Sequence, residues 1–352
     1  MTTTPVVRVL GDLAHARVHT PTAACDCGEP RVLADRPDGT VVRSGPVVAK
    51  AHAPDTGAAG LTARLSLAAS PGLAGILLPP LGDEARPVPA PCAEPPAVPA
   101  PCAQAQARPG PQAVQDPVRL RTPDGRAVSL WPYGEPVDPA DPDAAPWEEA
   151  AALLAALHRT PPPHPLPPMR GPAKAAVAVE RMRAARPGEP VTDAVLAAWR
   201  GLPGWARAEG PALAHRSAFL CHGDLHLGQL VRHPGPHGPW LLIDVDDAGL
   251  GDPAWDLARP AAWYAAGLLP PEVWLRFLDA YRAEGGPAVR PEGDPWPELD
   301  VPARALTVQT AALALAKSAA ERRSPDEVEQ LMIDACARIA SLPPRLTAGR
   351  AS

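Results

Sequence analysis

The sequence predicts a two-lobed α+β protein, with a small β-rich N-terminal lobe and a larger helical C-terminal lobe. Up to about residue 137, short apolar runs alternate with turn signals, whereas beyond residue 138 apolar residues recur with helical spacing. Strands followed by helices are typical of α+β proteins, and 352 residues are enough for two cores. We therefore expect lobes at 1–137 and 138–345, with a ligand-binding cleft between them.

The first 80 residues are expected to be strands joined by turns. Apolar runs lie at 31–34, 40–43 and 47–52. They are separated by Pro-Asp-Gly at 37–39 and by Ser-Gly at 44–45, and both sequences favour turns. This order predicts an antiparallel meander.

A helix, a further strand and a hairpin are expected to complete the N-terminal lobe. Apolar residues at 58–69 have helical spacing, which Ser-Pro-Gly at 70–72 ends. Residues 75–78 are apolar enough for a buried strand, and the Pro-Asp-Gly turn at 123–125 predicts a hairpin over 118–131.

Residues 79–117 differ in composition from the rest of the lobe. Pro and Ala dominate, and the unit VPAPCA occurs at 88–93 and again at 98–103. Such a segment offers no apolar face for packing, so we expect a polyproline-like surface insertion without a catalytic role.

The C-terminal lobe is expected to hold several helices and a short strand-rich segment at 217–247. Asp141 or Asp143 is placed to cap the first helix. The helices are predicted at 146–159, 173–186, 191–208, 253–266, 271–284, 299–322 and 326–341.

Composition and charge disfavour several classes of function. The net charge is −6 and no long basic run occurs, whereas nucleic-acid binding needs clustered Lys and Arg. No apolar run reaches the roughly 18 residues of a membrane span, and no secretory signal is visible, so we expect a cytoplasmic protein without a membrane partner. Cys25 and Cys27 form the only close cysteine pair, which is too few ligands for a closed zinc site.

Polar residues suited to phosphoryl transfer gather in the strand-rich segment. Asp224 and Gln229 lie five residues apart, and Asp244 directly follows the apolar run 241–243. The turn sequence at 233–238 predicts a hairpin that brings Gln229 and Asp244 near one another. Phosphoryl transfer requires a carboxylate that accepts the proton of the attacking hydroxyl, oxygen ligands for Mg²⁺, and a cation on the non-reacting phosphates.

Lys50 is the candidate for that cation. It follows the apolar run 47–49, which predicts a place on a strand of the first lobe. Only Lys50, Lys174 and Lys317 are lysines in a chain that otherwise uses Arg, so a lysine here is informative.

Three segments together resemble a known superfamily. They are VVAK at 47–50, HGDLHLGQ at 222–229 and LLIDVDDAGLGDPAWDLA at 241–258. The combination is similar to the aminoglycoside phosphotransferase and choline kinase superfamily, over about residues 30 to 341. The resemblance implies a protein-kinase-like fold and a kinase that uses ATP and Mg²⁺ to phosphorylate an alcohol group of a small molecule.

The resemblance also implies roles for individual residues. Asp224 would be the catalytic residue, Gln229 and Asp244 would hold Mg²⁺, and Lys50 would contact the α- and β-phosphates. The backbone at 131–134 would be the interlobe hinge that meets the adenine, which makes Trp131 and Tyr133 cofactor-binding residues. Asp252 and Asp256 would brace the catalytic loop.

Several neighbouring residues keep more than one interpretation. Asp246 and Asp247 could lie near the metal, face a cationic substrate, or form a solvated acidic turn. His222 is expected to be a buried, hydrogen-bonded structural residue, and the role of His226 stays open.

Three departures from the superfamily pattern bear on the substrate. Gln229 replaces the usual Asn, and the form HGDLHLGQ is similar to that of maltokinases and glucosamine kinases. The Gly that those kinases carry shortly after the metal-binding Asp is missing, and 51–75 contains Asp55 but no Glu to pair with Lys50. An aminoglycoside, a sugar or an amino sugar therefore remain as acceptors. The alternative is a catalytically silent pseudokinase that acts as a regulator or scaffold.

Overall fold

The computed structural model describes residues 5–19, 28–36, 38–82, 120–210 and 218–342. The chain divides into two compact units, one made of residues 1–69 and 78–133, the other of residues 70–77 and 134–352. The predicted insertion at 79–117 lies outside the described residues, apart from its first four positions.

The first unit is built on a five-stranded antiparallel sheet, ordered β1-β2-β3-β5-β4. The meander and the hairpin predicted from turn chemistry are both present. The strands are β1 (Arg31–Arg36), β2 (Gly39–Ser44), β3 (Val47–His52), β4 (Leu120–Arg121) and β5 (Ala127–Pro132).

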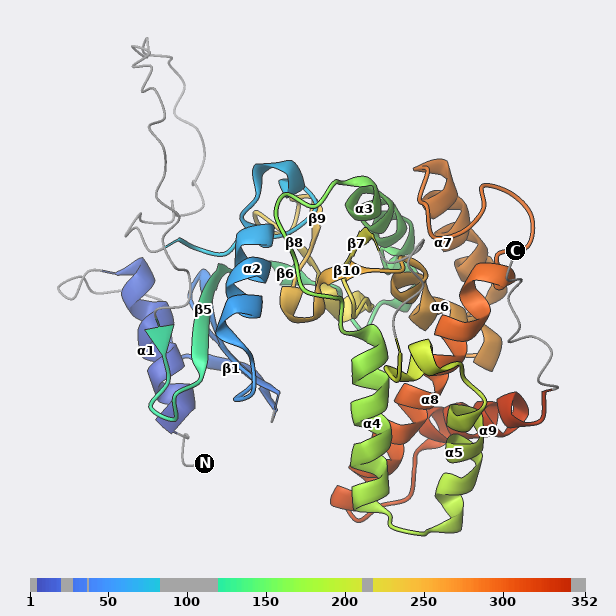
Figure 1. The fold of residues 1–352 in the computed structure, drawn as a ribbon. Helices are drawn as coiled ribbons and strands as arrows, with labels where there is room; N and C mark the ends of the chain where they lie inside the picture. Colours follow the sequence, from blue (N-terminus) through green and yellow to red (C-terminus); the bar gives the residue numbers. More distant parts are fainter. Residues whose placement is uncertain (1–4, 20–27, 37, 83–119, 211–217, 343–352) are drawn as a thin grey trace. The chain divides into compact units, whose positions relative to one another are not determined.

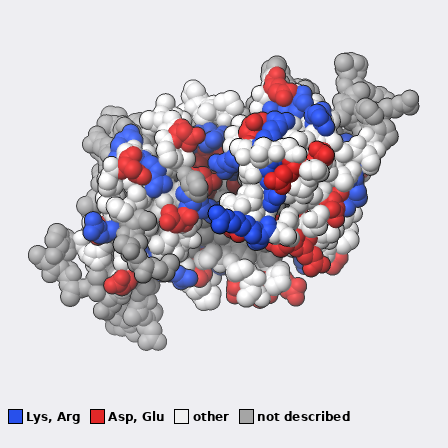
Figure 2. Space-filling model, turned by 90° about the horizontal axis from the view of Figure 1, so that it is seen from below, with Lys and Arg blue, Asp and Glu red and all other residues white. Residues whose placement is uncertain are grey.

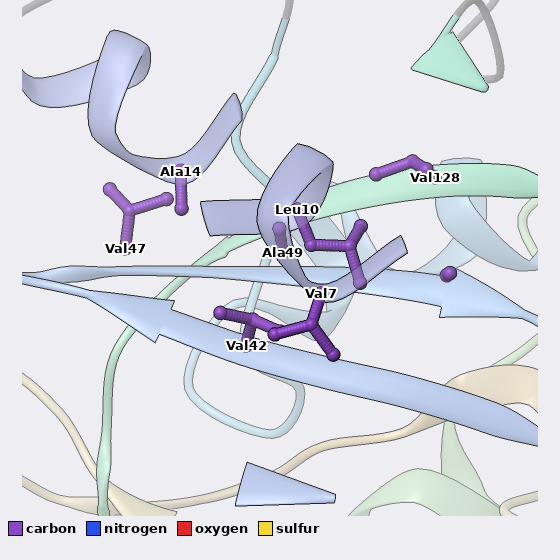
Figure 3. Packing of buried hydrophobic residues seen from close by; sticks show 8 residues of the cluster. Val7, Leu10, Ala14, Val42, Val47, Ala49 and Val128 are labelled. Atoms are coloured by element: carbon purple, nitrogen blue, oxygen red, sulfur yellow. The ribbon is translucent and has the colours of Figure 1, made fainter. Parts of the chain in front are cut away.

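A helix that the sequence analysis did not predict covers one face of this sheet. Helix α1 (Pro5–Val18) buries Leu10 and Ala14 against Val42, Val47 and Ala49, as Figure 3 shows. The expectation of strands throughout the first 80 residues was therefore wrong at the N-terminus. The apolar residues of α1 recur at every third or fourth position, which is the helical period.

Helix α2 (Ala58–Ala68) forms as predicted, and its Leu61 and Leu65 are buried. The strand expected at 75–78 does not form. Leu77 makes only an isolated parallel bridge to Leu242, and Leu242 donates its backbone N–H to Ile76. Residues 70–77 therefore belong to the second unit.

The second unit combines two small sheets with a helical body (Figure 1). Its strands are β6 (Glu135–Pro136), β7 (Phe219–Cys221), β8 (Leu230–Arg232), β9 (Trp240–Leu242) and β10 (Gly249–Gly251). Its helices are α3 (Trp147–Arg159), α4 (Gly171–Ala185), α5 (Asp193–Arg200), α6 (Ala254–Ala266), α7 (Pro271–Ala283), α8 (Trp296–Ala320) and α9 (Glu327–Ala340). Helix α8 packs against α4, α6 and α9, while α3 packs against α7.

Two local predictions in this unit need correction. Asp141 caps the short 3₁₀ helix Pro142–Ala144, whereas α3 begins after Pro146 without a side-chain cap. The helix predicted over 191–208 is limited to α5, flanked by 3₁₀ turns, because Gly201 and Pro203 interrupt it.

Within the described residues, no helix is both long and apolar enough to cross a membrane. On the face drawn in Figure 2, acidic and basic side chains are interspersed.

Candidate active site

The loop that follows β7 carries Asp224 and is held in a conformation that requires glycine. Cys221, the last residue of β7, pairs with Gly249 of β10. Gly223 has a φ of +86°, and a Cβ at this position would lie 2.3 Å from the carbonyl oxygen of Asp247. The loop therefore approaches the segment around Asp247 more closely than any side chain at position 223 allows.

Asp256, in the first turn of α6, stabilises this loop through hydrogen bonds to its backbone. Its carboxylate accepts hydrogen bonds from the backbone N–H groups of His222 and Gly223, both at 2.7 Å. His158 Nε2 lies 2.9 Å from the same carboxylate, and His158 Nδ1 lies 2.7 Å from the Tyr281 hydroxyl. Burial alone would raise the pKa of Asp256, but the contacts with His158 and the loop outweigh it and hold this pKa below its usual value.

Asp252 has a different structural role. Its side chain accepts a hydrogen bond of 3.0 Å from the backbone N–H of Ala254, at the start of α6. This hydrogen bond stabilises the beginning of the helix that carries Asp256.

Asp224 is held at both carboxylate oxygens by cations from two helices. Oδ2 lies 2.7 Å from Lys174 Nζ on α4, and Oδ1 lies 2.5 Å from Arg259 Nη2 on α6. Arg259 also donates from Nε to the carbonyl of Leu225 at 2.9 Å. Burial opposes ionisation of Asp224, but the charges of Lys174 and Arg259 outweigh it and lower its pKa, so it is a carboxylate at neutral pH.

Asp247 is the second anionic partner of Lys174. Lys174 Nζ lies 2.6 Å from Asp247 Oδ2, and Arg170 Nε lies 3.7 Å from Oδ1. Burial would lower the pKa of Lys174, but Asp224 and Asp247 raise it above its usual value, so the amine stays charged. Asp247 is therefore not a solvated acidic turn, one of the interpretations left open by the sequence.

Lys174 and Arg259 are not among the site residues expected from the sequence. The signal for Lys174 was available, because the scarcity of lysine used to single out Lys50 applies equally to position 174. Arg259 carried no such signal, since arginine is common throughout the chain.

Gln229 and Asp244, the expected metal ligands, lie at the ends of two adjacent strands. Gln229 directly precedes β8 and Asp244 lies two residues after β9, and Leu230 of β8 pairs with Leu242 of β9. The backbone N–H of Ile243 donates to the carbonyl of Gln229 at 2.9 Å. Asp244 has a φ of +63° and its side chain accepts from the backbone N–H of Asp246. One carboxylate and one amide oxygen are ligand types that Mg²⁺ accepts, so this donor set fits the ion.

Two histidines of the loop are structural in their contacts. His222 is fully buried and donates from Nε2 to the carbonyl of Ile243 at 2.7 Å, which joins the loop of Asp224 to the strand end before Asp244. His226 accepts a hydrogen bond at Nδ1 from the backbone of Gly228. Burial lowers the pKa of His226 to about 4, so its ring is neutral at pH 7.

The three residues expected to bind the nucleotide lie in the first unit. Lys50 lies on β3 between Val41 of β2 and Ser129 of β5, and its side chain is half-buried. Trp131 donates from Nε1 to the Ser129 hydroxyl at 2.8 Å, and the ring of Tyr133 lies 3.4 Å from the guanidinium carbon of Arg43.

No acidic residue occurs on α2, the helix that follows Lys50. Instead, α2 carries the buried Arg64, and Asp55 in the preceding loop is exposed. The helix that follows Lys50 therefore lacks the Glu that the superfamily pattern predicts there.

The fold is similar to that of several solved small-molecule kinases. A choline/ethanolamine kinase family protein from Mesorhizobium loti aligns over 96% of this chain and 98% of its own, with 14% identity and a TM-score of 0.55. A thermostable mutant of aminoglycoside phosphotransferase APH(4)-Ia, in a ternary complex with AMP-PNP and hygromycin B, gives 96% and 99% coverage, 13% identity and a TM-score of 0.54. Choline kinase LicA from Streptococcus pneumoniae gives 96% and 99%, 11% identity and a TM-score of 0.54.

A sequence profile identifies the family. The profile of the phosphotransferase enzyme family matches residues 93–296, more than half of the chain. A search of curated protein sequences gave no significant match. The chain belongs to the phosphotransferase enzyme family, and the predicted kinase-like fold and phosphotransferase class are confirmed.

Proposed function

We propose that this enzyme transfers the γ-phosphoryl group of ATP to a hydroxyl group of a sugar-like small molecule, with Asp224 as the catalytic residue. The observation that carries the proposal is the state of Asp224. It is ionised, fixed at both oxygens, and placed on a loop whose backbone is braced by Asp256. A fixed carboxylate is the group that phosphoryl transfer requires beside the attacking hydroxyl.

In this proposal, Asp224 orients the acceptor hydroxyl and accepts its proton. A bond forms between the acceptor oxygen and the γ-phosphorus, and the bond between that phosphorus and the β,γ-bridging oxygen breaks. The products are the phosphate ester and ADP, and the proton held by Asp224 passes to solvent. The carboxylate keeps lone pairs for the hydroxyl, because each of its oxygens can accept more than one hydrogen bond.

Residues already described would supply the nucleotide and metal sites. Asp244 and Gln229 would hold Mg²⁺, which would neutralise charge on the nucleotide phosphates. Lys50 would contact the α- and β-phosphates, with Trp131 and Tyr133 beside the adenine. The use of ATP is supported by the related APH(4)-Ia, whose complex contains the ATP analogue AMP-PNP.

A sugar or a singly charged amino sugar fits the site better than a polycationic aminoglycoside. Asp246 and Asp247 are the two carboxylates that could face a positively charged acceptor. Asp247 is already paired with Lys174 and Arg170. A polycation would have to compete with these side chains and would meet Arg259 beside Asp224. The HGDLHLGQ form, similar to that of sugar kinases, agrees with this assignment.

A mass-spectrometric screen tests the proposal. Wild-type protein is incubated with Mg-ATP and a metabolite mixture that includes sugars, amino sugars and aminoglycosides, and phosphorylated products are identified. Asp224→Ala should form no product yet keep its affinity for ATP, while the control Asp279→Ala, at an exposed position of α7, should match the wild type.

Two results would refute the proposal or redirect it. Wild-type turnover by Asp224→Ala would remove Asp224 from the chemistry. ATP binding without any product across the panel would instead support the silent pseudokinase.

A further inference from the structure

Lys174 links two loops of the candidate active site. Its Nζ lies 2.7 Å from Asp224 Oδ2 and 2.6 Å from Asp247 Oδ2, so one ammonium group bridges two carboxylates. The side chains are shielded but not sealed from solvent, with exposed fractions of 28% for Lys174, 18% for Asp224 and 14% for Asp247. Nothing in the superfamily resemblance assigned a role to this position.

The backbone fixes where Lys174 lies. The N–H of Met169 donates to Leu250 at 2.9 Å, and the N–H of Arg170 donates to the carbonyl of Asp247 at 3.1 Å. Helix α4 begins at the next residue, and the N–H of Lys174 donates to Arg170 at 2.8 Å. Lys174 therefore lies one helical turn after Arg170, whose backbone is hydrogen-bonded to that of Asp247.

The bridge has a geometric consequence for Asp224. Arg259 of α6 contacts Oδ1 and Lys174 of α4 contacts Oδ2, so the carboxylate forms ion pairs with two different helices. With either cation removed, the carboxylate can rotate about its terminal torsion, which is soft for aspartate. A reacting group that is misplaced by about 1 Å can cost about 10²-fold in rate.

We propose that Lys174 is a positioning residue of the phosphoryl transfer: it fixes the Asp224 carboxylate toward the acceptor hydroxyl and ties the loop of Asp224 to that of Asp247. This inference rests on the proposed function, because it assigns Lys174 its role through Asp224. The same bridge occupies Asp247 and keeps that carboxylate from serving as a ligand for the acceptor.

Three variants at position 174 separate positioning from simple stabilisation. Lys174→Ala removes the ammonium and leaves space, Lys174→Met removes the charge but keeps the volume, and Lys174→Arg keeps the charge. Lys317→Ala is the matched control, because Lys317 is an exposed lysine near the end of α8. Each is assayed for kcat, for the KM of ATP, for the pH dependence of kcat/KM and for thermal stability.

We expect Lys174→Ala and Lys174→Met to lower kcat about 10²-fold with little change in the KM of ATP. Lys174→Arg should retain part of the rate. Ethylammonium should restore activity to the Ala variant, where there is space for it, and not to the Met variant.

The pH profile tests whether the Lys174 ammonium acts on Asp224, while a lowered kcat beside an unchanged KM of ATP, restored by ethylammonium, is the readout that a merely structural ion pair would not give. Asp224 is faced by Lys174, Arg259 and His226, with Asp247 across the bridge. Loss of the Lys174 charge removes one influence that lowers the pKa of Asp224. The acidic limb of the profile should therefore shift to higher pH in the Ala and Met variants.

The same series distinguishes failure of this inference from failure of the proposed function. If wild-type enzyme has no acceptor, or if Asp224→Ala retains full turnover, the proposed function is wrong. If those two behave as expected while Lys174→Ala has the kcat and pH profile of Lys317→Ala, only the positioning role is overturned. A lowered melting temperature with unchanged kcat, whether or not the pH profile shifts, would also overturn it, in favour of a structural ion pair.

Discussion

Replacement of Asp256 by Ala should destabilise the second unit more than a typical core substitution. Asp256 is fully buried, and the change would leave the N–H groups of His222 and Gly223 without their acceptor and His158 without its partner. An unsatisfied buried donor costs about 1–3 kcal/mol, and two backbone donors would lose their acceptor here. We expect a loss of about 4 kcal/mol in the free energy of unfolding.

Urea denaturation and thermal unfolding, followed by circular dichroism, measure this loss. For a unit of this size, about 4 kcal/mol corresponds to a fall of about 8–16 °C in melting temperature. Asp256→Asn keeps one acceptor oxygen and should lose less, while Asp279→Ala serves as the surface control. A change for Asp256→Ala no larger than that of the control would refute the assignment of Asp256 as the brace of the catalytic loop.

Three further substitutions have defined outcomes. Gly223→Ala should reduce kcat by about 10²-fold in steady-state assays, because its Cβ would force the loop away from Asp247; an unchanged kcat would contradict the close approach. Leu10→Ala should cost about 3 kcal/mol in urea denaturation if α1 covers the first sheet as described, and a negligible cost would speak against that packing. The Arg323 guanidinium lowers the pKa of Glu329 from 4.5 to about 2, so this pair contributes stability above pH 4.5 that is lost as the pH falls toward 2. Arg323→Ala should therefore lower the stability only slightly at pH 7, since both groups contact solvent, and an acid titration should show the difference disappearing near pH 2; a constant difference would exclude the linkage.

The order of elements could be predicted well where turn chemistry and helical period agree. The strands β1, β2, β3 and β5 and most helices of the second unit follow from these signals. Helix α1 lies in a region for which strands are expected, although its own apolar residues have helical spacing. The apolar content of 75–78 predicts a strand, but the backbone of this segment meets residue 242, over 160 positions away, only in an isolated bridge.

For the site, the chemical types of residue could be predicted, but not their pairing. Asp224 and Asp256 stood out through motifs, and the contacts of Asp256 with the loop match the expected brace. The cation partners of Asp224 come from α4 and α6, 50 and 35 positions away in the sequence. Only tertiary packing decides which of many arginines, and which of three lysines, reaches that carboxylate.

The discontinuity of the first unit limits how this protein can be divided. The chain crosses from one unit to the other after residues 69, 77 and 133, so a single cut never separates them. A fragment that starts at residue 134 would lack residues 70–77 and leave the backbone N–H of Leu242 without its Ile76 acceptor, at the strand end that precedes Asp244. A recombinant catalytic fragment would therefore need residues 70–77, added as a separate peptide or joined through a linker. Recombination between related genes would preserve this site only if residues 70–77 and the chain from residue 134 were exchanged together.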